Sequence, residues 1–198
     1  MSQNILVLDL ETQRTFEDVG SRNNLKALGV SVVGVYSYKT EKYHAFWEKD
    51  FPKLESWLQE RPFVVGFNQR KFDMPVLQAY MKLDLSKLPM VDLLEDIHKV
   101  LGHRVSLDSV AQATLGKSKI GHGLDAIKYW RTGELEKLRE YCLEDVRITK
   151  EVFEYGIKQK EVFYLSKFGN NKLKASVNWT MKHPESNKKE DERQISLF

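Results

Sequence analysis

The chain has 198 residues, of which 41% are hydrophobic and 30% charged, and its formal net charge is +3. This size suits one compact domain with a short extension, and so small a charge permits nucleic acid as a partner without indicating it. The single cysteine excludes an internal disulfide and a cysteine-based zinc site. No apolar run reaches the roughly 18 residues of a membrane span, and the start of the chain lacks the basic region of a signal peptide, so we expect a cytoplasmic protein.

The first half of the chain contains the segments expected to form one sheet. Unbroken apolar runs and segments rich in valine and aromatic residues predict five strands, the second and third as an antiparallel pair. The expected strands are Ile5–Leu10, Val30–Tyr38, Lys42–Trp47, Phe63–Phe67 and Pro89–Val91. Helical spacing over Phe51–Glu60 predicts a helix that Asp50 caps. A second helix is expected from Asp73 to Met81.

The second half of the chain reads as helical from Asp92 to Tyr155 and then changes character. Glu161–Lys167 and Lys172–Trp179 alternate around a Gly-Asn-Asn turn and predict a hairpin. Lys182–Arg193 is almost wholly polar or charged, which is typical of a disordered linker. The order of the elements predicts an α/β fold in which helices flank a mixed five-stranded sheet. We therefore expect one domain over residues 1–180, with the terminal hairpin at about 160–180, and a flexible tail over residues 181–198.

Acidic side chains follow two of the expected strands. Asp9 and Glu11 end an apolar strand and project from the same face of it, although such a pair is also common at an exposed strand end. The segment from Asn68 to Asp73 lies at a strand-to-helix turn, where Asp73 equally suits an ordinary helix cap.

A third acid lies on the last long helix. Tyr141 and Asp145 are four residues apart and stack on one face, inside an apolar stripe. A buried aspartate needs compensation, and the alternative to a functional role is a core tyrosine beside a salt bridge from Asp145 to Arg139 or Arg147.

Taken together, the three segments predict a metal site. Four carboxylates brought together by separate elements cannot all ionise unless cations neutralise them. Ligands that offer only oxygen suit Mg²⁺ or Mn²⁺ rather than zinc. Two such ions about 3.5–4 Å apart are a recurring device for cutting phosphodiesters.

The same segments resemble the motifs of a known nuclease group. LDLET, GFNQRKFD and YCLED stand in the order found in the DEDD superfamily of 3′→5′ exonucleases, the ribonuclease H-like group that includes polymerase proofreading domains and ribonuclease D. The tyrosine of the third motif is similar to that of the DEDDy branch. The likeness covers roughly residues 3–155 and implies a ribonuclease H-like fold.

This resemblance implies a site with two Mg²⁺ or Mn²⁺ ions. Asp9 would bridge both ions, Glu11 and Asp145 would complete the first, and Asp73 would serve the second. Tyr141 would orient the attacking water, since a phenol with a pKa near 10 is a poor base. The implied reaction releases nucleoside 5′-monophosphates from a 3′ end.

Four residues beside the motifs are the expected substrate contacts: Leu10, Thr12, Asn68 and Phe72. Family members hold the terminal nucleotide next to the first motif, and Leu10 or Phe72 can wedge or stack on a base. Core packing explains these two apolar side chains equally well. We expect single-stranded DNA 3′ ends as the substrate. A ribonuclease D-like enzyme that trims RNA is the alternative on the same site, and an inactive nucleic-acid-binding adaptor is the alternative from another class.

The last five residues, QISLF, resemble the short peptide with which bacterial replication and repair enzymes dock on the sliding clamp. Gln194 would supply a polar anchor beside Ile195, and Leu197 and Phe198 would fill an apolar pocket. The polar linker before them would provide reach. This likeness implies a bacterial sliding clamp as a partner and a role in DNA replication or repair. A domain that simply ends on a few apolar residues is the alternative.

Overall fold

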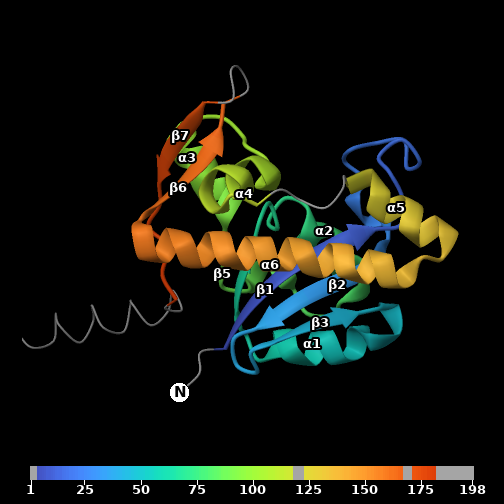
Figure 1. Cartoon of the computed structure of the whole chain (residues 1–198). Coiled ribbons are helices and arrows are strands. Elements are labelled where there is room, and N and C mark those ends of the chain that lie inside the picture. The colour runs from blue at the N-terminus through green and yellow to red at the C-terminus, as the bar shows by residue number, and fades with distance from the viewer. Residues whose placement is uncertain (1–3, 118–122, 167–170, 182–198) are drawn as a thin grey trace, which may run out of the picture.

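A computed structural model describes residues 4–117, 123–166 and 171–181 (Figure 1). The strands are β1 (Ile5–Thr12), β2 (Val30–Ser37), β3 (Lys42–Phe46), β4 (Phe63–Gly66), β5 (Met90–Asp92), β6 (Glu161–Leu165) and β7 (Lys172–Ser176). The α-helices are α1 (Phe51–Gln59), α2 (Asp73–Leu77), α3 (Leu93–Leu101), α4 (Leu107–Leu115), α5 (Gly123–Thr132) and α6 (Leu135–Gln159). The predicted linker and the clamp-like peptide at 194–198 lie outside the described residues.

The larger sheet has five strands in the spatial order β3-β2-β1-β4-β5. Strand β1 runs antiparallel to β2 and parallel to β4, and β5 runs parallel to β4. Pairing between β1 and β4 stops at Val7, opposite Val65, whereas β1 continues to Thr12. The end of β1 therefore lies beyond the end of β4. The predicted α/β fold with a mixed five-stranded sheet and a terminal hairpin is confirmed.

The pleat of β1 divides the core in two. Val7 belongs to the cluster formed with α3, α4, α6 and the hairpin, whereas Leu8 belongs to the cluster formed with α1 and α2. Because strand side chains alternate between faces, Asp9 and Glu11 follow Val7 on the face that α6 covers. The apolar run before these acids thus fixes the direction in which their carboxylates point.

The longest helix among the described residues, α6, has 25 residues and one buried stripe. Its outer face carries ion pairs three residues apart, including Arg139 with Glu136 and Arg147 with Glu144. The two arginines considered as alternative partners of Asp145 are thus engaged with glutamates. An apolar stripe opposite a charged face is typical of a helix that packs on a core, and among the described residues no helix is long and apolar enough to cross a membrane.

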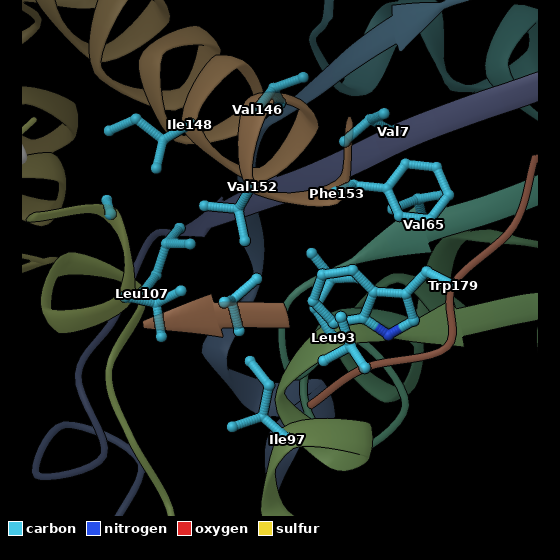
Figure 2. Close-up of a cluster of buried hydrophobic side chains, with 14 of the residues drawn as sticks. Val7, Val65, Leu93, Ile97, Leu107, Val146, Ile148, Val152, Phe153 and Trp179 are labelled. Atoms are coloured by element: carbon cyan, nitrogen blue, oxygen red, sulfur yellow. The ribbon is translucent and has the colours of Figure 1, made fainter. Parts of the chain in front are cut away.

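The hairpin β6–β7 packs at the end of α6 opposite to α5 (Figure 1). Trp179, just after β7, lies in the buried cluster with Val152 and Phe153 of α6 (Figure 2). A Cβ at Gly156 would overlap the Trp179 ring, so this glycine allows the indole to lie against the helix. The indole N–H donates to Asp96 on α3 at 3.2 Å. The hairpin is therefore part of the main core.

The outer edge of β6 is covered by two hydroxyl side chains of α4. Ser109 Oγ accepts from the Leu165 N–H at 2.9 Å and donates to the Leu165 carbonyl at 3.2 Å. Thr114 Oγ1 makes the same two contacts with Phe163, both at 2.9 Å. Since these backbone groups are already bonded, β6 does not offer them to a further strand.

Two local predictions were wrong. Asp50 does not cap α1; its carboxylate accepts from the Trp47 N–H at 3.2 Å and closes the short 3-10 turn before the helix. Helix α2 ends at Leu77 rather than Met81, and a 3-10 turn follows it. The Gln78 side chain donates to two carbonyls of the following segment and accepts a third hydrogen bond from it, which holds the chain in a turn instead of another helical turn.

Candidate metal centre

The end of β1 supplies the first two acids of the site. Asp9 and Glu11 are half-buried, and they lie opposite Gly34 and Val32 of β2. The register shifts directly after Glu11, so the regular pairing ends at Thr12. Both carboxylates therefore lie where the strand leaves the sheet, on the face next to α6.

Gly34 lets α6 approach this part of the sheet. A Cβ at Gly34 would lie 2.9 Å from both Cys142 Sγ and Val146 Cγ2, which is closer than such atoms approach in folded proteins. The Cys142 thiol also donates a hydrogen bond to the Asp9 carbonyl oxygen at 3.7 Å. The missing side chain thus brings the turn of α6 that carries Asp145 next to Asp9.

The three acids from β1 and α6 form one cluster. Asp9, Glu11 and Asp145 each offer a carboxylate oxygen, and the three oxygens lie within 4.8 Å of one another. Asp145 is buried. Like charges this close destabilise one another unless a cation or protons neutralise them. A donor set made only of carboxylate oxygens fits Mg²⁺ or Mn²⁺, so the residues present fit the predicted metal.

Asp73 reaches the same region from the first turn of α2 but lies outside this close group. Its side chain is buried, and Oδ1 accepts from the Leu10 N–H at 3.1 Å. That amide is available because β1 has passed the end of β4. Burial raises the pKa of Asp73, the Leu10 hydrogen bond opposes the rise, and the charges of Asp92 and Asp145 add to it. Asp73 therefore lies close enough to Asp145 for the two negative charges to repel.

Tyr141 lies one helical turn before Asp145 and is buried. Burial raises the pKa of its phenol well above 10, and the charges of Asp145, Glu11 and Asp9 raise it further. The phenol is therefore a hydrogen-bond donor at neutral pH rather than a base. The structure places all five predicted catalytic residues around the end of β1.

A fifth acid, which is not among the predicted site residues, organises the second motif. Asp92 is buried at the end of β5, and its carboxylate accepts from the backbone N–H groups of Asn68, Arg70 and Glu95 at 2.8, 3.0 and 3.2 Å. It thereby caps α3 and also holds the turn before Asp73. The spacing D-x-x-E at residues 92–95 is a capping signal that could have revealed the cap, although not its link to the distant turn.

The four predicted substrate residues differ in exposure. Leu10 is buried in the core, and the Thr12 hydroxyl donates to the Arg14 carbonyl at 3.0 Å. Asn68 has a left-handed backbone with φ of 71°, and its side-chain oxygen accepts from the guanidinium of Arg104 at 2.6 Å. The half-buried Phe72 adjoins Asp73 directly. Their role toward substrate stays a prediction.

With the fold and the acids in place, comparison with known proteins defines the family. The model of the RNase H superfamily matches residues 6–157. The chain belongs to the RNase H superfamily. No protein of curated function matches this chain.

Solved structures support the same assignment of the fold. The chain is similar to the family B DNA polymerase from the hyperthermophilic archaeon Pyrobaculum calidifontis, with a TM-score of 0.60 and 20% sequence identity. The similarity covers 78% of this chain and 24% of the polymerase chain, so the RNase H-like chain spans about a quarter of the polymerase. At this identity the likeness concerns the fold alone.

Proposed function

We propose that this RNase H-like chain is a divalent-metal-dependent 3′→5′ exonuclease of the DEDDy type, which acts on single-stranded DNA ends. The observation that carries the proposal is the cluster of Asp9, Glu11 and Asp145 at the end of β1, with Asp73 and Tyr141 beside it. A structural salt bridge does not need this arrangement, whereas a phosphodiester hydrolase that works with two metal ions does.

Each residue has a separate task in this proposal. Asp9, Glu11 and Asp145 would hold the cations. Asp73 would be a further ligand, and the hydrogen bond from the Leu10 N–H holds its carboxylate in place. When bound, Mg²⁺ or Mn²⁺ supplies charge neutralisation for the phosphate and activation of water. Tyr141 would donate a hydrogen bond that orients the attacking water, because its phenol stays protonated.

One feature favours DNA over RNA as the substrate. The terminal peptide resembles those that dock on the sliding clamp during DNA replication and repair. The proposed product is a nucleoside 5′-monophosphate, released one residue at a time from the 3′ end.

A panel of defined ends tests this proposal. The protein is incubated with Mg²⁺ or Mn²⁺ and with 5′-labelled single strands of DNA and RNA, and circular single-stranded DNA serves as the control for endonuclease activity. We expect stepwise shortening of the linear DNA, release of 5′-monophosphates and intact circles. Faster digestion of RNA would favour the ribonuclease D-like alternative. Binding that resists EDTA, without any release of nucleotides, would favour the adaptor.

We further propose that residues 194–198 recruit the enzyme to a bacterial sliding clamp. The pentapeptide fits the docking pattern at every position and follows a long polar segment. Replacing Leu197 and Phe198 by alanine should leave cleavage of free oligonucleotides unchanged and abolish co-elution with the clamp. The matched control is Asn187→Ala in the linker, which should co-elute normally. Unchanged co-elution of the double variant would reject this partner.

A further inference from the structure

The segment between β1 and β2 forms a tethered loop beside the acidic cluster. Its ends are joined by two backbone hydrogen bonds, from Gln13 N–H to the Gly29 carbonyl and from Arg14 N–H to the Leu28 carbonyl, both 3.1 Å. Its middle is tied to α5 by the ion pair of Asp18 with Arg131. Figure 1 shows the loop beside α5, past the tip of the β1 arrow. The loop therefore follows the acid-bearing end of β1 directly and is tied at its ends and to α5.

This loop carries an aromatic ring to the second motif. The Phe16 ring meets the Phe72 ring edge to face, with centroids 6.2 Å apart. Phe72 directly precedes Asp73, so the ring pair begins one residue away from a predicted metal ligand. Both rings are half-buried: they pack partly on the core and keep an open side.

A cation covers the outer ring of this pair. The guanidinium carbon of Arg22 lies 5.6 Å from the centroid of Phe16, and Arg22 is exposed. The acid nearest in the loop, Asp18, is already engaged by Arg131 and by the Thr15 hydroxyl. Arg22 thus presents its charge to solvent beside an aromatic face, the combination that proteins use to hold single-stranded nucleic acid.

We propose that Phe16, Phe72 and Arg22 form the surface that holds the single strand immediately 5′ of the nucleotide to be released. The exposed Arg22 side chain would turn from the Phe16 ring to a backbone phosphate, and the Phe16 face that it leaves would stack on an unpaired base. This inference rests on the proposed nuclease function and deepens it, because it defines the substrate as a strand with at least two unpaired nucleotides at its 3′ end. Stacking tolerates any base, so the surface does not select a sequence.

The variants Phe16→Leu and Arg22→Gln test this surface. Leucine keeps the packing on the core but removes the aromatic face, and glutamine removes an exposed charge, so neither should lower the melting temperature appreciably. For a single-stranded oligonucleotide we expect KM to rise roughly tenfold with kcat nearly unchanged. Arg22→Gln should also reduce the slope of log KM against log salt by about 0.7, the value for one phosphate contact on a single strand.

A one-nucleotide substrate separates this inference from the proposed function. The p-nitrophenyl ester of thymidine 5′-monophosphate has no neighbouring base or second phosphodiester, so both variants should hydrolyse it like the unaltered protein. If the unaltered protein hydrolyses neither substrate, the proposed function itself is overturned. If the two variants hydrolyse both substrates normally, only the inference is overturned. The inference is also overturned if the variants lose activity equally on both substrates and melt at a lower temperature.

The hairpin offers a matched control. Phe163 and Lys172 form a similar pair, with Lys172 Nζ 4.2 Å from the ring centroid, at the end of α6 away from the acidic cluster (Figure 1). The variants Phe163→Leu and Lys172→Gln should leave KM for the oligonucleotide unchanged. A rise in KM equal to that of the loop variants would overturn the inference, because it would show that any loss of a surface aromatic or cation weakens binding.

Discussion

Asp145 is the buried member of the three-acid cluster. Asp145→Asn keeps the shape of the side chain but removes one of the three clustered carboxylates. Loss of a hydrogen-bond partner of a metal ligand commonly costs 10–100-fold in activity, so loss of a ligand itself should lower kcat by more than about 100-fold. Steady-state kinetics measures this. The metal-free variant should melt no lower than the unaltered protein, because a repulsive charge is gone.

The neighbouring residue supplies the control for that experiment. Glu144→Gln removes an acid from the outer face of α6, where Glu144 pairs with Arg147. Arg147 is exposed and Glu144 is half-buried. A pair at the protein surface contributes little, so kcat should stay within about twofold of the unaltered protein. Equal losses in both variants would argue against a specific role for Asp145.

At the same scale, Asp92 should matter for both stability and activity. Asp92→Ala leaves three backbone N–H groups without their acceptor. Loss of a helix cap and of further buried hydrogen bonds should cost about 2–3 kcal/mol in the free energy of unfolding. Urea denaturation measures that cost, and kcat should fall because the turn before Asp73 is no longer held. Asp84→Ala removes a cap on an exposed turn and should cost less than about 1 kcal/mol without loss of kcat.

At the scale of elements, the spacing between α6 and the sheet decides whether the acids meet. Gly34→Ala would place a methyl group 2.9 Å from Cys142 Sγ and Val146 Cγ2, so α6 would have to move away. Overpacking of this kind costs about 1–3 kcal/mol, and a displacement near 1 Å can cost about 100-fold in rate. We expect a lower melting temperature together with a large loss of kcat.

A second glycine on α6 provides the comparison. Gly156→Ala would also overpack the helix, because the new methyl group would overlap the Trp179 ring at the far end. It should destabilise the protein without lowering kcat below the melting transition. If the two alanine variants lost activity equally, the close approach at Gly34 would not be specific to the site. A partial recovery in Gly34→Ala combined with Cys142→Ala, which removes one of the two clashing atoms, would support it.

The elements themselves were largely predictable from the sequence, and their close approach was not. Apolar runs and alternation located the strands, because burial on one or both faces leaves a simple pattern. The prediction that Asp50 caps α1 was wrong because a carboxylate before a helix can accept from a preceding N–H as well as from an N–H of the helix. Gly34 stands in a valine-rich strand, and only the packed structure shows that α6 occupies the space its side chain would fill.

At the scale of the molecule, metal binding should be visible as stability. Repulsion within the acidic cluster is relieved when a divalent cation binds, and a ligand at 100 times its Kd stabilises a fold by about 2.7 kcal/mol. For a chain of this size that corresponds to a rise of roughly 5–10 °C in melting temperature. Differential scanning fluorimetry with and without Mn²⁺ measures it, with EDTA reversing the shift. Asp145→Asn should lose most of this rise, and an undiminished rise would place the metal elsewhere.

The candidate site could be predicted because its residues occur in short motifs. Asp9, Glu11, Asp73, Tyr141 and Asp145 each lie in a segment whose local pattern fixes the element and the face. The contacts of Asp92 and Arg104 with Asn68 could not be predicted, because they join segments that are 24 and 36 residues apart in the sequence. Contacts of this range depend on tertiary packing, which a local pattern does not encode.

The packing of Trp179 into the gap at Gly156 bears on how this protein can be shortened. A truncation placed where the family similarity stops, at residue 157, would delete both strands of the hairpin and leave Val152 and Phe153 facing water. Such a fragment would retain every acid of the site and still be prone to aggregate. Useful expression boundaries therefore lie after Trp179, because the acids of the candidate site need a shorter length of chain than the solubility of the domain does.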